Sequence, residues 1–370
     1  GTARWAYNWT LSKEKDNYRI NNTFLNDGIL RKQLTQQKKL NEYNWLNNYS
    51  NNITKQSIKD ACDAYKRFFK HESNFPKFKS KKISTPSFYI DPYKIEFNKN
   101  HVKLEKLNNG SLKKNRNVIN WIKLAEKNRI PLSCKYYNPR VIYDGIHWWI
   151  SIGVDAPGCF ERPFNNGVGV GIDVGIKNLA ICSNGNTYKN INKSSVIKKL
   201  KKKRCRLQRK VSKKYLNNKK GECYCKTHNI IKSEKQLLKL NHRLTNIRHN
   251  YLHQVTSEIV KREPSFIVLE DLNVKGMMKN KYLAKAIQEQ CFYEFYRQLQ
   301  YKCEWNNIKF ITADRFFPSS KLSSVCGCIN KDLKLSDRIY ICPECGNTID
   351  RDYQAALNLY KYGLNELNIN

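Results

Sequence analysis

The stretch GVGVGIDVGIKNLAICSNG, residues 167–185, decides how the second half of this 370-residue chain folds. Its two apolar runs flank a tight DVGIKN turn, and this arrangement predicts a β-hairpin that opens a mixed sheet. Asp173 lies inside the first run, where burial of an unpaired carboxylate would cost several kcal/mol unless cations meet it. The stretch therefore predicts a sheet that carries a buried acid.

Helix and strand patterns alternate on the C-terminal side of this hairpin. Apolar residues recur at steps of three and four through residues 234–262, which predicts one amphipathic helix about 40 Å long. A proline break follows, and FIVLE at 266–270 predicts a buried strand that ends on Glu270. Asp352 precedes a further helical segment, YQAALNLYKYG, and is expected at its N-terminus. Alternating strands and helices are typical of an α/β domain.

The N-terminal side divides into a helical region and a strand-forming region. Residues 1–84 carry apolar side chains at helical spacing, and FPKFKSKK at 75–82 breaks that pattern. Residues 85–165 contain short runs such as SFYI, KIEF, HVKL and RVIYDGIHWWISIGV, whose period-two alternation predicts antiparallel strands. APGCFERPFNNG, residues 156–167, is a linker-type stretch that predicts a domain boundary.

The charge balance favours a nucleic-acid partner. Lysine and arginine number 68 against 31 acidic residues, and the formal charge of +37 is costly in self-repulsion unless a polyanion neutralises it. A basic membrane-surface protein would also be positive, but the sequence has no 18-residue apolar run and no apolar signal segment at its start, so we expect no membrane partner. Thirteen cysteines, single and in close pairs, predict a reducing compartment, cytoplasmic or nuclear, and a metal site.

Three acidic residues stand apart from the rest. Most acids in so basic a chain are expected to be solvated or paired with lysines. Asp173 and Glu270 instead belong to apolar strands, and Asp352 opens a helix. Such a set of carboxylates is what a two-metal Mg²⁺ site requires, and two-metal sites hydrolyse phosphodiesters. By spacing alone, the three acids could equally be a helix N-cap and two charge-paired strand ends.

Three motifs carry a resemblance to a known family. GIDVGIKNLA at 171–180, FIVLEDLNVKGM at 266–277 and IDRDYQAALNL at 349–359 resemble, in that order, the three RuvC motifs of the TnpB nucleases. The likeness extends to RWAYNWTL, AYKRFFK, FPKFKSKK and RFFPSSK, and so covers nearly the whole chain. TnpB proteins are transposon-encoded, RNA-guided DNA nucleases, and their relatives include the Fanzor proteins and the smaller type V CRISPR effectors.

The resemblance implies a fold and a domain order. We expect a multidomain α+β and α/β protein in which a helical recognition lobe (1–84) precedes a β-barrel wedge domain (85–165). An RNase H-like RuvC nuclease domain then occupies 166–318 and 349–370, and a zinc-ribbon-like module is inserted at 319–348. In relatives a wedge strand precedes the RWAYNWTL motif, so the first strand of the barrel is expected to be absent here.

The resemblance also assigns the site and its partners. Asp173, Glu270 and Asp352 are expected to be catalytic and to bind two Mg²⁺ ions. The implied partners are a noncoding guide RNA and a double-stranded DNA target. Asp350 is interpreted as supporting at most. Gln354 stands where relatives usually carry asparagine, so we expect a shifted hydrogen bond and a reduced rate rather than lost activity.

The cysteines near the third motif depart from the family pattern. The family has two Cys-x-x-Cys pairs in its ribbon, whereas Ser323 stands here at the position of the first cysteine. Cys328 is the available replacement, and a metal-free ribbon of reduced thiols is the alternative. The predicted Zn²⁺ ligands are Cys326, Cys328, Cys342 and Cys345. A further segment, GECYCKTHN at 221–229, lacks a fourth ligand nearby and is interpreted as an insertion without metal, despite Cys223, Cys225 and His228.

Two cationic stretches are candidate nucleic-acid surfaces. KKLKKKRCRLQRKVSKK, residues 198–214, has eleven lysines or arginines and no acid. A solvated helix face or a targeting patch is the ordinary interpretation, but beside a phosphodiesterase site such a helix would bind guide and target backbones. FPKFKSKK interleaves Phe75 and Phe78 with lysines, which suits stacking on unpaired bases, and packing of these rings in a core is equally expected. The candidate contacts are Lys77, Lys79, Lys201, Lys202, Lys203, Arg204, Arg206, Arg209 and Lys210.

The sequence thus predicts an RNA-guided, Mg²⁺-dependent DNA endonuclease with one RuvC-type site. The nuclease activity follows from the residues, whereas RNA guidance follows from the resemblance alone. Two alternatives stay open. The chain could be an RNA-guided DNA-binding repressor with weak cleavage, or an unguided RNase H-like resolvase or transposase.

Overall fold

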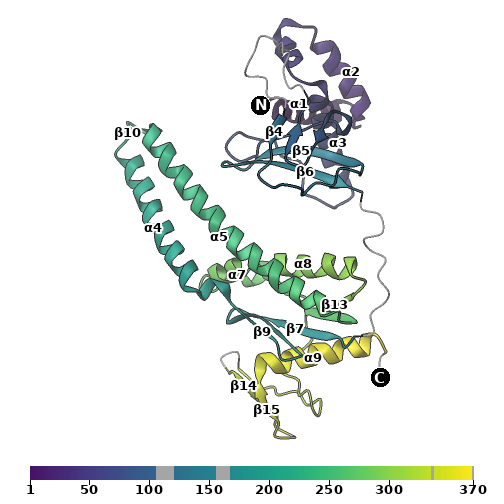
Figure 1. Cartoon of the computed structure of the whole chain (residues 1–370), viewed down its shortest axis with the longest axis vertical. Coiled ribbons are helices and arrows are strands. Elements are labelled where there is room, and N and C mark those ends of the chain that lie inside the picture. Colours follow the sequence, from purple (N-terminus) through teal and green to yellow (C-terminus); the bar gives the residue numbers. More distant parts are fainter. Residues whose placement is uncertain (106–120, 156–166, 335–336, 369–370) are drawn as a thin grey trace. The chain divides into compact units, whose positions relative to one another are not determined.

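The structure, a computed structural model, describes residues 1–105, 121–155, 167–334 and 337–368 (Figure 1). The chain divides into two compact units, Gly1–Ala156 and Pro157–Asn370. The linker predicted at 156–167 lies outside the described residues except for its last one. Within the described part of the chain, no helix is long and apolar enough to cross a membrane.

The first unit begins with helices, as the spacing of apolar residues predicts. They are α1 (Thr2–Asn21), α2 (Asp27–Gln37), the 3₁₀ helix η1 (Asn41–Asn48) and α3 (Asn51–Phe69). Asn26 and Ser50 cap α2 and α3 with side-chain oxygens that accept backbone N–H groups, which fixes where these helices begin. Leu30, Leu46 and Ile58 are buried where α2, η1 and α3 meet.

Two small antiparallel sheets complete the first unit. One has the order β1-β5-β6 and the other the order β2-β3-β4. Their bounds are β1 (Ser87–Tyr89), β2 (Glu96–Phe97), β3 (His101–Lys103), β4 (Trp121–Lys123), β5 (Tyr136–Tyr143) and β6 (Trp148–Val154), with η2 (Pro92–Lys94) between β1 and β2. The antiparallel pairing is confirmed. The barrel is not, because neither sheet closes on itself among the described residues.

An ion pair joins the helices of the first unit to its larger sheet. Arg140 of β5 donates two hydrogen bonds, of 2.7 and 2.8 Å, to the two carboxylate oxygens of Asp60 on α3. Burial alone would raise the pKa of Asp60, but these hydrogen bonds lower it on balance. A bidentate arginine clamp of this kind fixes geometry as well as charge.

A five-stranded mixed sheet forms the centre of the second unit, in the order β13-β12-β7-β8-β9. Its strands are β7 (Val170–Val174), β8 (Asn178–Cys182), β9 (Thr187–Lys189), β12 (Phe266–Glu270) and β13 (Lys309–Ala313). β7 and β8 are antiparallel with Ile172 opposite Cys182, which confirms the predicted hairpin. β12 runs parallel to both β7 and β13.

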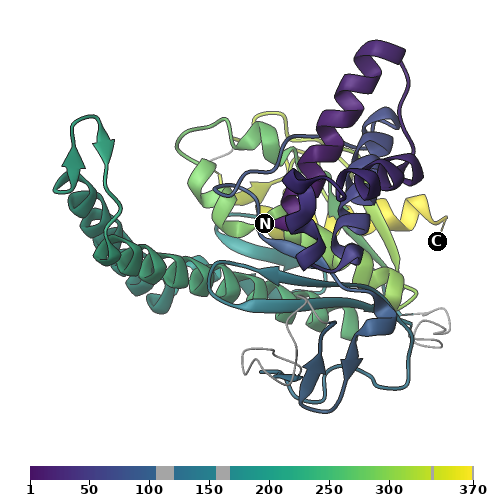
Figure 2. The ribbon, with the colours of Figure 1, turned by 90° about the horizontal axis from the view of Figure 1, so that it is seen from above.

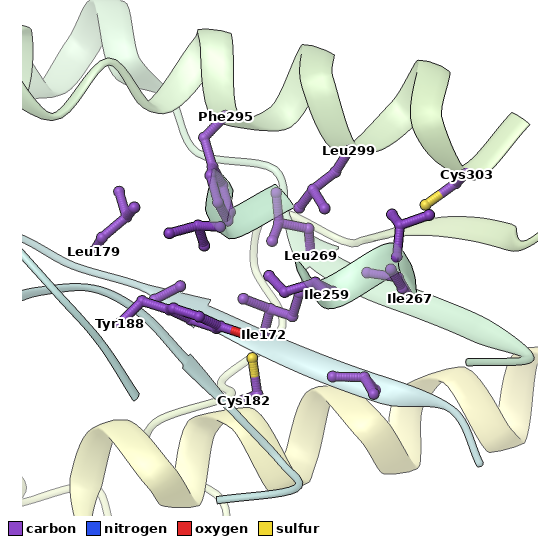
Figure 3. Packing of buried hydrophobic residues seen from close by; sticks show 14 of the residues in the cluster. Ile172, Leu179, Cys182, Tyr188, Ile259, Ile267, Leu269, Phe295, Leu299 and Cys303 are labelled. Atoms are coloured by element: carbon purple, nitrogen blue, oxygen red, sulfur yellow. The ribbon is translucent and has the colours of Figure 1, made fainter. Parts of the chain in front are cut away.

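Helices cover both faces of this sheet. Ile267 and Leu269 of β12 face a core shared with α5 (His228–Lys261) and α8 (Phe292–Trp305), as Figure 3 shows. Phe266 and Val268, one residue out of phase, face α9 (Arg351–Glu366). β12 is therefore apolar on both faces, as expected for a strand inside an α/β layer.

The remaining elements extend from this core. α4 (Ser195–Leu216) and α5 lie side by side, as Figures 1 and 2 show. A short hairpin of β10 (Lys219–Lys220) and β11 (Cys223–Tyr224) connects the end of α4 to the start of α5. The long helix predicted at 234–262 is confirmed, although it begins at His228. Shorter elements are η3 (Ile191–Lys193), α6 (Val274–Met277), α7 (Ala284–Gln290), β14 (Ile339–Ile341) and β15 (Thr348–Asp350).

The contact between α9 and β7 is a backbone contact. A Cβ atom built on Gly171 would lie 2.2 Å from the Ala356 carbonyl oxygen and 2.3 Å from the Tyr360 backbone nitrogen. A Cβ atom built on Gly363 of α9 would lie 2.4 Å from the Phe266 ring and 2.5 Å from a Val268 methyl group, both on β12. Glycine at these positions lets the helix lie directly on the sheet.

Gly171→Ala is expected to lower the free energy of unfolding by roughly 1–3 kcal/mol or more, because the backbone atoms that its methyl group meets cannot rotate away. Thermal unfolding would show this as a melting temperature lower by about 2–4 °C per kcal/mol. Gly175→Ala is the matched control, since its Cβ would lie 3.5 Å from the nearest atom. An unchanged melting temperature for Gly171→Ala would contradict the close packing of α9 on β7.

Candidate functional site

The fold brings the three predicted carboxylates to one edge of the sheet. β12 is parallel to β7 with Leu269 opposite Ile172, so Glu270 and Asp173 follow at the same ends of neighbouring strands. Asp352 is the second residue of α9, the helix that lies across β7. Residues separated by 97 and 82 positions in the chain therefore meet where two parallel strands end and a helix begins.

Burial and mutual repulsion dominate the electrostatics of this site. Burial raises the pKa of Asp173 well above its usual value, and the negative charges of Glu270 and Asp352 raise it further. Burial also raises the pKa of Glu270. A partly buried cluster of neighbouring acids is the environment that a hard divalent cation stabilises.

The three carboxylates are less tightly clustered than three of the cysteines. Among the described residues, they do not form a group whose ligand atoms all lie within 4.8 Å of one another, whereas three cysteines do. Two ions about 3.5–4 Å apart need a wider opening than one ion does. The two-ion site stays a prediction.

The sequence analysis did not identify two arginines that lie near Asp352. Arg351 and Arg338 place nitrogens 3.5 and 3.8 Å from the Asp352 carboxylate oxygens. The Arg351 charge also opposes the rise in the pKa of Asp173. Asp350, interpreted as supporting, is the N-cap of α9 and accepts the backbone N–H groups of Asp352 and Tyr353 at 3.0 and 3.1 Å. A cap at this position fixes the first turn that carries Asp352.

A serine that the sequence analysis did not single out contacts the second carboxylate. The Ser319 hydroxyl donates a hydrogen bond to Glu270, and Ser319 is only 5% exposed. Asn358 of α9 donates to the backbone carbonyls of Ser319 and Leu322 at 2.7 and 2.6 Å. Such outer contacts orient metal-binding carboxylates. Ser319 lies in RFFPSSK, which the sequence offered only as part of a resemblance.

Gln354 also belongs to this network. It is fully buried, and its amide nitrogen donates to the Leu322 carbonyl at 2.7 Å. Its amide oxygen accepts the Ser324 hydroxyl at 2.9 Å. The amide therefore ties α9 to the loop before the cysteines, while the effect of glutamine on rate stays a prediction.

The cysteine module lies next to α9, and three of its four predicted zinc ligands come together. The Sγ atoms of Cys326, Cys342 and Cys345 all lie within 4.8 Å of one another, and the first two are 3.4 Å apart. Hydrogen bonds from the backbone N–H groups of Cys345 and Glu344 lower the pKa of the Cys342 thiol to about 6. A thiol with so low a pKa is readily a thiolate, the form that binds metals.

Cys328 is not a member of this group, and its place in the predicted ligand set stays a prediction. The Cys328 thiol is hydrogen-bonded to Glu344, and burial together with this contact raises its pKa to about 11. The Ser323 hydroxyl, in contrast, lies 3.8 Å from the Cys345 Sγ. The sequence analysis chose the cysteine nearest in sequence, whose thiol lies outside the group of three although the charges of Cys342 and Cys326 also raise its pKa.

The cationic residues of α4 divide between a solvent face and an internal contact. Most of them are exposed and recur at steps of three and four, which places them on one side of the helix. The exposed candidates are Lys202, Lys203, Arg206, Arg209 and Lys210. Arg204 is partly buried, and Lys201 forms an ion pair with Glu289 of α7. The ammonium group of Lys201 is thus used within the fold.

In the FPKFKSKK segment too, one candidate lysine makes contacts within the fold and another is exposed. The Lys79 ammonium lies 3.7 Å from the centroid of the Tyr7 ring, and Asn8 forms two 2.8 Å hydrogen bonds with the Lys79 backbone. A nucleic-acid contact of Lys79 therefore finds no support, whereas Lys77 is exposed. Phe75 packs edge-on against Tyr65 and Phe68, and Phe78 is 58% exposed.

Two known families match parts of the chain that lie largely in the second unit. Residues 150–281 match the family described as a probable transposase, OrfB of IS605, and residues 292–359 match the Cas12f1-like TNB domain. The fold is similar to that of the protein in the cryo-EM structure of a Cas12f1-sgRNA-target DNA complex, with a TM-score of 0.62 and 16% identity. That similarity covers 97% of this chain and 80% of the Cas12f1 chain, and it confirms a mixed α/β fold of this type.

Curated relatives match over most of their length. A protein named "Putative RNA-guided DNA endonuclease InsQ" from Escherichia coli K12 is 27% identical over 379 residues, which cover 98% of this chain and 87% of that protein. A "Putative RNA-guided DNA endonuclease" from Streptomyces pristinaespiralis is 30% identical over 334 residues, covering 90% of this chain and 76% of its own length. The match to the Streptomyces relative and the match to the transposase family show that the chain belongs to the TnpB family, the IS605 OrfB group of transposon-encoded proteins.

Proposed function

We propose that the chain is an RNA-guided DNA endonuclease that hydrolyses phosphodiester bonds of double-stranded DNA at a single RuvC-type site. The observation that carries this proposal is the partly buried triad of Asp173, Glu270 and Asp352, in which the charges of Glu270 and Asp352 add to the raised pKa of Asp173. The names of the E. coli and Streptomyces relatives support the same activity. One active site would cut the two DNA strands in turn.

The carboxylate oxygens of Asp173, Glu270 and Asp352 would hold two Mg²⁺ ions, which supply an activated water and neutralise charge on the leaving 3′ oxygen. Neighbouring residues of the chain hold these carboxylates in position. Ser319 holds the Glu270 carboxylate through its hydroxyl group, and Asp350 fixes the turn that carries Asp352. Arg351 balances part of the negative charge beside Asp352.

The partners are a noncoding guide RNA and its complementary DNA target. The exposed cationic face of α4, defined by Lys202, Lys203, Arg206, Arg209 and Lys210, would bind phosphate backbones without reading sequence. The Cas12f1 chain of similar fold was solved with a guide RNA and target DNA, which agrees with this assignment. The cysteine content suits a reducing compartment, so we place the protein in the cytoplasm, or in the nucleus of a eukaryotic host.

The domain division follows the family. We assign 1–84 to a helical recognition lobe, 85–165 to a wedge domain, 166–318 and 349–370 to the nuclease domain, and 319–348 to a ribbon that binds Zn²⁺. The three clustered thiols of Cys326, Cys342 and Cys345 support zinc, because soft thiolate ligands favour it over Mg²⁺.

Asp173→Ala is expected to abolish cleavage while RNA binding persists, because the substitution removes a metal ligand but leaves the cationic face intact. The protein is purified with its RNA, the RNA is sequenced, and a matching DNA is tested for Mg²⁺-dependent cleavage. Glu304→Gln removes an exposed acid from the same unit and is the control. Defined RNA without cleavage by the wild type would favour the repressor, and cleavage that persists after RNA removal would favour the resolvase.

Asp173→Asn should stabilise the metal-free protein at about pH 8. The folded pKa of Asp173 is raised, so its contribution to stability is present at low pH and is lost as the pH rises through that pKa. Asparagine carries no charge to bury, and the variant should therefore melt higher than wild type at about pH 8 but not at about pH 4. Added Mg²⁺ should raise the wild-type melting temperature more than that of the variant. Equal melting temperatures at both pH values would contradict a buried carboxylate.

Lys202→Gln with Arg206→Gln should weaken nucleic-acid binding and reduce its salt dependence. Loss of two phosphate contacts should lower the slope of log K against log salt by about 1.4–1.8. Lys261→Gln with Lys309→Gln removes the same charge from the other edge of the sheet and should leave the slope unchanged. Equal slopes for both double variants would show that α4 makes no backbone contact.

A further inference from the structure

Two segments of the cysteine module have the same local architecture. We name residues 323–327 the first knuckle and residues 342–346 the second knuckle. Each begins with a buried side chain, Ser323 or Cys342, both 2% exposed. Each ends with a glycine at positive φ, 76° at Gly327 and 67° at Gly346. The amide of each of these glycines donates to the carbonyl of the first residue of its knuckle, at 3.0 and 3.1 Å.

The resemblance extends to the side chain that begins each knuckle. In the second knuckle, the backbone N–H groups of Glu344 and Cys345 point at the Cys342 sulfur. In the first knuckle, the backbone N–H groups of Val325 and Cys326 point at the Ser323 hydroxyl oxygen, at 3.3 and 3.4 Å. The serine oxygen thus occupies the place in the first knuckle that the cysteine sulfur occupies in the second.

The distances in the group agree with one tetrahedral ion. Zinc–sulfur bonds near 2.3 Å place tetrahedral sulfurs about 3.8 Å apart. Cys326 and Cys342 are separated by 3.4 Å between sulfurs, and the Ser323 oxygen lies 3.8 Å from the Cys345 sulfur. The two contacts join the knuckles pairwise, so the serine oxygen lies beside the group that the three sulfurs form.

We propose that the ribbon binds one zinc ion through the thiolates of Cys326, Cys342 and Cys345 and the side-chain oxygen of Ser323, and that Cys328 is not a ligand. This inference deepens the zinc-ribbon proposal and rests on it, but it does not depend on nuclease activity. On binding, the three thiols release their protons to solvent and the serine hydroxyl keeps its own. The bound site then carries one net negative charge instead of the two of a four-thiolate site.

An oxygen at the fourth corner has a chemical consequence. A neutral hydroxyl is a weaker zinc ligand than a thiolate, so the fourth position exchanges with water more readily. The ion should therefore be held less tightly and leave faster than from a four-cysteine ribbon. The first knuckle is also tied to α9, because Gln354 accepts from Ser324 and donates to Leu322.

The test compares the full chain with three variants, Ser323→Ala, Ser323→Cys and Cys328→Ser, with Cys345→Ser as the variant that should lose metal. Zinc content is measured by elemental analysis, affinity by competition with a chromophoric chelator, and the ligand set by X-ray absorption at the zinc edge. None of these measurements requires nucleic acid or cleavage.

Wild type and Cys328→Ser should both contain one zinc ion with three sulfur ligands and one oxygen ligand. Ser323→Cys should show four sulfurs and bind zinc at least about tenfold more tightly. Ser323→Ala should keep three sulfurs and lose zinc faster than wild type. Four sulfurs in wild type that fall to three in Cys328→Ser would overturn the role of Ser323. A wild-type chain that binds no zinc would overturn the zinc ribbon as well, and neither result would bear on the nuclease.

Discussion

The direct contact between the backbone of β7 and that of α9 is the constraint on which the site depends. Gly171 has no side chain, and the space where one would stand holds backbone atoms of Ala356 and Tyr360. The helix can therefore approach the strand closely enough to deliver Asp352 beside Asp173. Parallel pairing of β12 with β7 then adds Glu270 at the same edge. Three acids that repel one another are held together because the apolar packing of strands and helix on both faces of β12 opposes their separation.

The same helix connects the carboxylates to the cysteine module. Asn358 and Gln354 hold the backbone of the loop that runs from Ser319 to Ser324, and Ser319 in turn contacts Glu270. The module thus belongs to the support of the site, which explains why a Cys-x-x-Cys pair lies a few residues before Asp352.

Local patterns were sufficient to predict the hairpin at 167–185, the long helix and the strand that ends on Glu270, because each follows from the spacing of apolar residues. Asp173 and Glu270 stood out in the sequence because an acid inside an apolar strand is unusual, whereas Asp352 stood out by its place at a helix start. Contacts between residues that are distant in the sequence were not predictable. The pairing of Lys201 with Glu289 spans 88 residues, and the Lys79 ammonium over Tyr7 joins two segments with no shared pattern. Cys328 was chosen by proximity in sequence, and its thiol lies outside the group that the other three thiols form.

The most direct test of the two-ion site is anomalous diffraction from crystals soaked in Mn²⁺, a scattering substitute for Mg²⁺. We expect two anomalous peaks about 3.5–4 Å apart, bounded by the carboxylates of Asp173, Glu270 and Asp352, and no peaks there in Asp173→Ala. A wild-type map without density between these three residues, or with manganese bound only elsewhere, would contradict the assignment of the triad as the metal centre.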